Sequence, residues 1–120
     1  MGEYKFQSLK VYQLGLDYVD IIYNLKNNLP RNEKYNLSSQ LIRSATSIVL
    51  NIAEGSTGQT DKELFRFLRI ALRSYIETVA GIDLIQRREY LSENDLIEVR
   101  KIGKILFYWI LNLQKSLNSS

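Results

Sequence analysis

Apolar residues recur at intervals of three and four along four long stretches of the chain, and short polar segments separate these stretches. This spacing places side chains on one face of an α-helix, as in a helix that packs one side against a core. The stretches cover about residues 9–28, 38–54, 60–88 and 93–117. Long helices joined by short turns pack antiparallel. The sequence therefore predicts an all-α protein, a single domain over residues 1–120 folded as an up-down-up-down four-helix bundle.

Each stretch has one apolar stripe that we expect to face the core. These positions are Val11, Leu14, Tyr18, Ile21 and Leu25; then Leu41, Ala45, Ile48 and Ile52; then Leu64, Leu68, Ala71, Tyr75, Val79 and Ile82; and finally Val99, Ile102, Leu106, Trp109, Leu113 and Leu117. A chain of this length buries enough surface for an independent core.

Breaker and cap residues mark the ends of the stretches. Pro30 ends the first, because proline donates no backbone hydrogen bond and disfavours helical dihedrals in the residue before it. Gly55 stands where a left-handed residue would end the second helix. The candidates for N-caps are Ser38 or Ser39, Thr60 in a capping box with Glu63, and the Ser92–Asp95 segment.

The composition narrows the possible functions. The sequence contains no cysteine and no histidine. It therefore lacks disulfides and thiolate zinc sites, and it also lacks the commonest general base and the commonest transition-metal ligand. We expect neither enzymatic activity nor a cofactor nor a metal site.

Charge and hydropathy point to a location and to classes of partner. The longest apolar run, Ile105–Leu111, is far too short to span a membrane, and residues 1–30 lack the pattern of a signal peptide. We expect a cytoplasmic protein with no membrane association. The net charge of +3 is compatible with binding RNA or DNA but does not require it.

Two stretches carry more apolar surface than one core needs. Apolar side chains cover about two-thirds of the third helix's circumference over residues 64–72, and residues 105–111 do the same in the fourth. An exposed patch of this size calls for a partner, and a second copy of the chain is the simplest one. The sequence predicts a homo-oligomer; the alternative is a monomer with scattered exposed aromatic residues.

A basic stripe runs along the third helix. It consists of Lys62, Arg66, Arg69 and Arg73. At 100° per residue these side chains fall within about 60° of arc, where they could contact successive phosphates. Arg43 in the second helix is a further candidate. The alternative is a solvated face, or one paired with carboxylates of a neighbouring helix.

A polar set lies near the turn between the second and third helices. Its members are Gln40, Arg43, Asn51, Glu54, Ser74 and Glu77. We expect a hydrogen-bond network that fixes helix packing. Glu54 lies at a helix C-terminus, where negative charge is disfavoured, so it should pair with Arg43 or Arg66. A carboxylate metal site from Glu54 and Glu77 is the weaker alternative, because the sequence lacks the Glu-x-x-His motif of di-iron bundles.

Several segments together resemble the four-helix bundle proteins of the 23S rRNA intervening-sequence family. The most specific is Asn51–Gly55, with the sequence NIAEG. The others are residues 9–13, Pro30 with 33–37, 40–45, 47–48, 63–68 and 70–71. The resemblance covers nearly the whole chain.

The resemblance implies properties beyond those read from the residues. Members of this family are bacterial, are often encoded in insertions within 23S rRNA genes, and resemble the accessory protein of diversity-generating retroelements. Those relatives form barrel-like homopentamers with a basic surface thought to contact nucleic acid. The resemblance therefore implies a homopentamer. The family's biochemical role is not established, and no catalytic residue carries over to this chain.

The sequence departs from the family pattern at two positions. Val49 stands where the family often has proline, which predicts a straighter second helix. Arg73 stands where it often has glycine, which adds a cation and argues against a close backbone contact there.

Two functions remain open at this point. The first is a nucleic-acid-binding accessory protein that uses the basic stripe. The second is a structural or adaptor oligomer that binds a protein partner through its apolar surface. Affinity for nucleic acid falls steeply with salt, whereas apolar docking does not.

Overall fold

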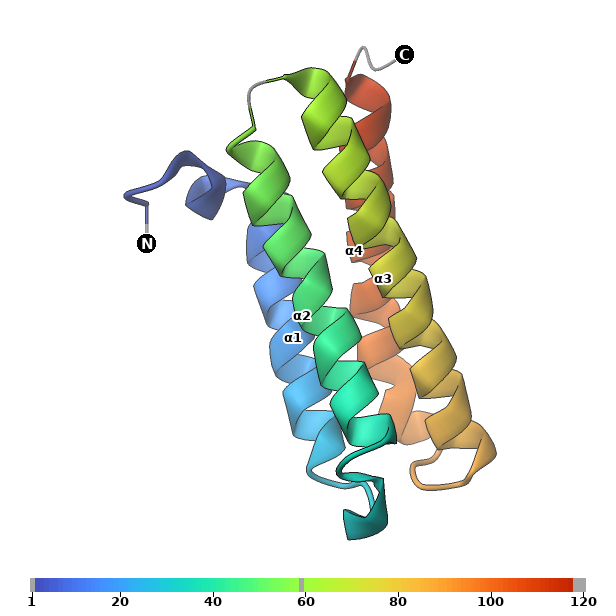
Figure 1. Cartoon of the computed structure of the whole chain (residues 1–120). Coiled ribbons are helices and arrows are strands. Elements are labelled where there is room, and N and C mark those ends of the chain that lie inside the picture. Colours follow the sequence, from blue (N-terminus) through green and yellow to red (C-terminus); the bar gives the residue numbers. More distant parts are fainter. Residues whose placement is uncertain (1, 59, 118–120) are drawn as a thin grey trace.

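The computed structural model describes residues 2–58 and 60–117, and these residues form helices and turns without any β-strand (Figure 1). The prediction of an all-helical four-helix bundle is confirmed. The helices are α1 (Lys10–Lys26), α2 (Leu37–Ser56), α3 (Asp61–Arg87) and α4 (Ile97–Ser116), and 3₁₀ turns occupy Lys5–Ser8, Arg31–Glu33 and Asn94–Leu96.

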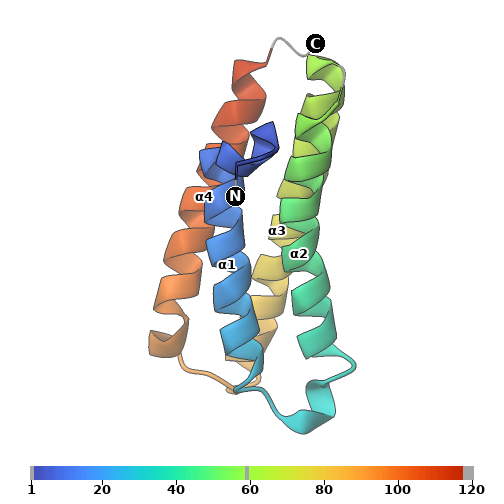
Figure 2. The ribbon, with the colours of Figure 1, turned by 90° about the vertical axis from the view of Figure 1, so that its left-hand side faces the viewer.

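Successive helices run antiparallel. In the α2–α3 pair, Ser44 lies beside Thr78 and Ser47 beside Ser74, so the residue numbers rise in one helix as they fall in the other. Between α3 and α4, Asp83 contacts Arg100, and Phe65 contacts Gln114 near the other end. Figure 2 shows α1 lying between α4 and α2, which completes the square. The resulting body measures 43 × 28 × 22 Å.

The core follows the predicted stripes with a rotation in two helices. The α2 stripe is buried as expected, and so are most of the α3 positions. In α1 the buried face is shifted, because Val19 and Ile22 are buried while Ile21 is only half-buried. In α4, Trp109 is 41% exposed and Ile110 is fully buried, so the prediction that Trp109 faces the core is wrong. At 100° per residue, the centre of the buried face lies about 50° from the centre of the predicted stripe in both helices, so Val11, Tyr18 and Leu106 are still buried as expected.

Two of the predicted N-caps are present. The Thr60 hydroxyl accepts a hydrogen bond from the Glu63 backbone N–H at 3.1 Å. Ser92 and Asp95 cap one another: the Ser92 N–H donates to the Asp95 carboxylate at 3.0 Å, and the Asp95 N–H donates to the Ser92 hydroxyl at 3.1 Å. This pair opens the 3₁₀ turn that leads into α4.

Other end signals were misread. Helix α2 begins at Leu37, so neither Ser38 nor Ser39 is its N-cap. Gly55 lies inside α2 and is not left-handed. The left-handed residue that follows a helix is Glu89, with φ 61°, after the end of α3. There the Tyr90 N–H donates to the Ile85 carbonyl at 3.1 Å, which is the long bond of a Schellman motif.

Candidate functional site

The basic stripe lies on the outer side of α3. Lys62, Arg66, Arg69 and Arg73 are all exposed. The buried positions of this helix are Leu68, Ala71, Tyr75, Thr78, Ile82 and Ile85. At 100° per residue the centre of the stripe lies about 180° from the centre of that buried set. The fold therefore directs all four cations straight into solvent.

No carboxylate neutralises the stripe within the described part of the chain. The ion pair found there is between Arg100 and Asp83, at 3.0 Å, on the side of α3 that faces α4. The Arg66 guanidinium instead lies over the ring of Phe67, 4.6 Å from its centre. This contact fixes one cation beside an aromatic face and leaves its charge unpaired.

The expected partner of Glu54 is absent. Glu54 is exposed, and neither Arg43 nor Arg66 forms an ion pair with it among the described residues. Arg43 is itself exposed on α2. Solvent screens the unfavourable interaction of an exposed carboxylate with a helix C-terminus, so no compensating cation is needed.

A chain of hydroxyls joins α2 to α3. The Ser47 and Ser74 hydroxyls are 2.9 Å apart, and those of Ser44 and Thr78 are 2.7 Å apart. The Asn51 amide donates to the Ser47 carbonyl at 2.8 Å and to its hydroxyl at 3.1 Å. We call this row of five residues, which includes two of the predicted polar set, the hydroxyl seam.

The other members of the predicted polar set do not join the seam. The Gln40 side chain donates to Asn36 at 3.2 Å, in the turn that precedes α2. Glu54 and Glu77 are exposed. Within residues 2–58 and 60–117 no three acidic side chains gather closely enough to hold a metal ion. The prediction missed Ser44, Ser47 and Thr78, although their spacing of three or four from other small polar residues of the same helix places them on one face.

Glycines let the helices approach closely on this side of the bundle. A Cβ on Gly55 would lie 2.6 Å from the Cβ of Phe67, and a Cβ on Gly81 would lie 2.7 Å from the Leu41 side chain. Small residues bring two backbones together, and the α2–α3 contact is the most extensive of any helix pair. The conformation of Gly55 is ordinary, so its role is to leave space.

The two departures from the family pattern have different places in the fold. Val49 packs directly on α1, where a Cβ on Gly15 would lie 2.7 Å from the Val49 side chain. Arg73 is exposed, so nothing within the described chain lies over it.

A buried carboxylate closes one end of the α2–α3 pair and was missed from the sequence. Glu33, only 8% exposed, accepts hydrogen bonds from the Tyr90 hydroxyl at 2.7 Å and the Asn36 amide at 3.1 Å. The Tyr90 hydrogen bond, followed by weaker contributions from Asn36, Leu37 and Arg88, holds the pKa of Glu33 below its usual value against the effect of desolvation. Glu33 thus ties the loop before α2 to the loop after α3.

Part of the predicted apolar excess is exposed. In α4, Tyr108 is 51% exposed and Trp109 is 41% exposed, whereas the apolar side chains of residues 64–72 in α3 are half-buried or buried. The half-buried apolar side chains of α3 and α4 include Phe65, Leu72 and Phe107. None of the helices in the described part of the chain has a stretch long and apolar enough to cross a membrane.

These features define a small antiparallel four-helix bundle with an unpaired basic stripe on one outer face. The family model of the 23S rRNA-intervening sequence protein matches residues 7–106. The chain belongs to this family, as its motifs indicated.

A solved structure supports the same assignment. It is a crystal structure of a protein of unknown function from the S23 ribosomal protein family of Bacteroides thetaiotaomicron VPI-5482. The two chains are 27% identical and superpose with a TM-score of 0.81, over 88% of this chain and 99% of that one. A comparison with curated proteins found no match.

Proposed function

We propose that this protein is a non-enzymatic, homo-oligomeric accessory protein that binds structured RNA through the outer face of α3. The observation that supports this most is the stripe of Lys62, Arg66, Arg69 and Arg73, which is exposed and has no acidic partner in the described chain. Unpaired cations along one ridge suit the regular spacing of phosphates. The family's connection with ribosomal RNA agrees with this chemistry.

Self-association would give the stripe its affinity. Four cations make few phosphate contacts, but an oligomer repeats them around its axis, and linked weak contacts add up to avidity. Exposed apolar side chains such as Ile76 and Tyr108 supply surface for the contact between copies. Light scattering should report several copies of the 14.0 kDa chain, about 70 kDa for a pentamer; a single 14.0 kDa species at micromolar concentration would refute assembly.

The binding test compares two charge reversals on different helices. Arg69→Glu removes a stripe cation, while Lys115→Glu makes the same change in net charge on an exposed position of α4. A fluorescent RNA hairpin of arbitrary sequence is titrated at about 50 and about 200 mM salt. We expect the parent and Lys115→Glu to bind with similar affinity and salt dependence, and Arg69→Glu to bind more weakly with a shallower salt slope.

The double variant Arg66→Glu with Arg69→Glu should abolish binding. Arg66 also contacts Phe67, so circular dichroism and light scattering on this variant check that fold and assembly survive. If Arg69→Glu binds RNA like the parent at low salt while still assembled, the stripe is a solvated face. The adaptor function, in which the apolar surface binds a protein, would then be favoured.

A further inference from the structure

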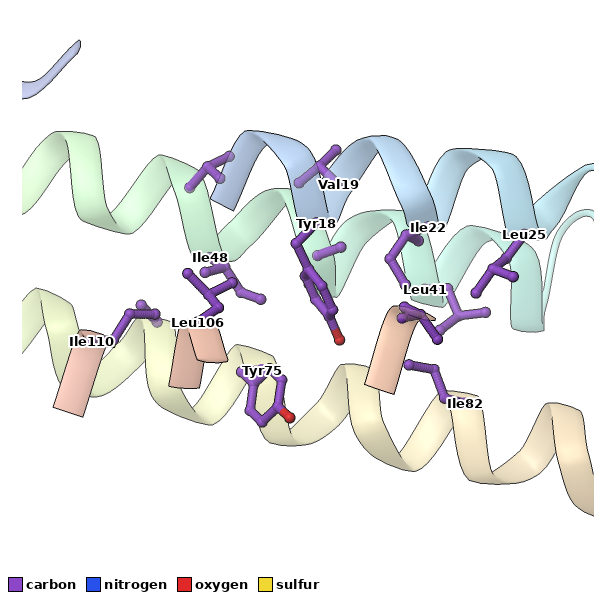
Figure 3. Close-up of a cluster of buried hydrophobic side chains, with 14 of the residues drawn as sticks. Tyr18, Val19, Ile22, Leu25, Leu41, Ile48, Tyr75, Ile82, Leu106 and Ile110 are labelled. Carbon is purple, nitrogen blue, oxygen red and sulfur yellow. The ribbon is translucent and has the colours of Figure 1, made fainter. Parts of the chain in front are cut away.

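A cavity opens between α3 and α4 on the side of α3 away from the hydroxyl seam. Its volume is about 370 Å³, within the range of small-molecule sites. Val79, Ile82 and Val99 provide apolar walls. Tyr18 of α1 and Tyr75 of α3 also line it, with ring centres 5.9 Å apart. Figure 3 shows the Tyr18 ring reaching from α1 across the core toward α3, where Tyr75 lies.

Next to the cavity, α4 meets these rings through a glycine. A Cβ on Gly103 would lie 2.8 Å from the Tyr18 ring and 3.0 Å from the Tyr75 ring. The rings therefore pack against the α4 backbone itself. The α3–α4 contact is less extensive than the α2–α3 contact, where small side chains bring the helices together.

One buried polar group beside the cavity has no partner among the described residues. Tyr18 is 1% exposed, and its hydroxyl forms no hydrogen bond within residues 2–58 and 60–117. Buried hydroxyls are nearly always paired, because an unpaired one loses its hydration without compensation. Burial, and to a lesser extent the nearby Tyr75, raises the pKa of this hydroxyl, so it stays protonated and able to donate.

The cavity also has a positively charged rim. Arg100, Lys101 and Lys104 line it, and Arg100 is held by Asp83 at 3.0 Å and by Gln86 at 2.9 Å. Lys101 and Lys104 are exposed, and neither pairs with a carboxylate among the described residues. Two cations, three positions apart and without a carboxylate partner among the described residues, therefore border an apolar space that has a buried, unpaired donor beside it.

We propose that this cavity binds a small organic anion with a flat apolar body. The anionic group lies at the rim against Lys101 and Lys104, and the body lies between the apolar walls. An acceptor atom at the far end of the ligand accepts a hydrogen bond from the Tyr18 hydroxyl. This site is separate from the basic stripe and does not depend on RNA binding.

The probe for this site is 4-nitrophenyl phosphate, which carries a dianion at one end, an aromatic ring, and nitro oxygens as acceptors at the other end. Isothermal titration calorimetry on the full chain should show saturable binding, one probe per chain. Inorganic phosphate, which has the charge alone, and 4-nitrobenzyl alcohol, which has the body alone, should each bind at least about tenfold more weakly.

Three variants assign the contacts. Tyr18→Phe should lower the affinity for 4-nitrophenyl phosphate about three- to tenfold. It should leave unchanged the affinity for phenyl phosphate, which lacks the nitro acceptor. The double change Lys101→Ala with Lys104→Ala should lower the affinity for both esters at least about tenfold, because it removes both rim cations. Lys115→Ala, on the same helix outside the cavity, is the matched control and should bind both like the parent.

The proposal is overturned if the parent shows no saturable binding at millimolar probe. It is also overturned if inorganic phosphate binds as tightly as the ester, or if the Tyr18 and lysine variants bind like the parent. Thermal melts of each variant establish that it is folded before its affinity is interpreted.

Discussion

Helix α3 makes two very different interfaces. Toward α2 it presents Ser74 and Thr78, whose hydroxyls meet partners at 2.9 and 2.7 Å. Toward α4 it presents Tyr75, and the aromatic rings there leave a cavity of about 370 Å³ with one unpaired hydroxyl. The first interface pairs its hydroxyls internally, whereas beside the second the Tyr18 hydroxyl, which comes from α1, has no partner among the described residues. Small side chains thus fix the packing on one side of a helix, while large ones leave room for a ligand on the other.

The largest loss of stability should come from adding a side chain to the glycine at the α2–α3 contact. Gly55→Ala places a Cβ 2.6 Å from the Cβ of Phe67, which cannot move without its backbone, so we expect a loss of about 2–3 kcal/mol of unfolding free energy. Gly103→Ala meets the ring carbons of Tyr18 and Tyr75 and the Tyr18 hydroxyl, side chains that have the cavity beside them, and the gain in helix propensity offsets part of the strain. Its loss should stay below about 1 kcal/mol. Urea denaturation measures both losses, and equal losses of unfolding free energy for Gly55→Ala and Gly103→Ala would contradict the difference between the two interfaces.

The hydroxyl seam should show energetic coupling across the helix pair. Ser44→Ala and Thr78→Val each leave a buried hydroxyl with one partner fewer, so each should cost about 1–2 kcal/mol. The double variant removes both groups and should cost less than the sum, with a coupling of about 0.5–1.5 kcal/mol in a double-mutant cycle. Strict additivity would show that the 2.7 Å contact contributes nothing specific.

Removing a hydroxyl beside the cavity should have the opposite effect on stability. Tyr18→Phe removes a buried hydroxyl that has no partner, so stability should stay level or rise by up to about 1 kcal/mol. The measurement is the urea midpoint of the ligand-free protein. A loss as large as that of Thr78→Val would mean that the Tyr18 hydroxyl is satisfied in the free protein, and the cavity would lose its unpaired donor.

The smallest effect concerns the end of the α2–α3 pair and depends on pH. The folded-state pKa of Glu33 is lowered, so its stabilising contribution is complete above the ordinary glutamate value of about 4.3 and is lost as pH falls through the lower folded-state value. Parent and Glu33→Gln should therefore differ in melting temperature at pH 7 and converge in acid. A difference that stays constant down to pH 2 would rule out this contribution.

The fold could be predicted because it depends on local patterns. Apolar stripes and caps such as Thr60 depend only on residues close together in the sequence, and the structure contains both. The errors arise where the answer depends on which helix lies opposite. Gly55 looks like a helix end in the sequence, but its absent side chain accommodates Phe67 from α3. The rotation of α4 by about 50° that buries Ile110 in place of Trp109 has the same origin, since only the bundle determines which face points inward.

The candidate sites divide in the same way. The basic stripe was visible because its members share one helix face, and all four are exposed. The polar set was only partly right: Asn51 and Ser74 lie in the hydroxyl seam, while Glu54 and Glu77 lie in solvent. The cavity was missed entirely. It requires Tyr18, Tyr75 and Gly103 from three helices to stand at one level, and no spacing within a single helix encodes that register.

We propose that α3 stabilises the fold through its α2-facing side and binds RNA through its outer side. The most direct measurement is the affinity of one RNA hairpin, at low salt, for Thr78→Val and Arg69→Glu side by side. We predict that Thr78→Val binds like the parent, because its change is buried, while Arg69→Glu binds about tenfold more weakly. The claim is contradicted if Arg69→Glu retains the parent's affinity, or if a folded Thr78→Val loses as much as Arg69→Glu.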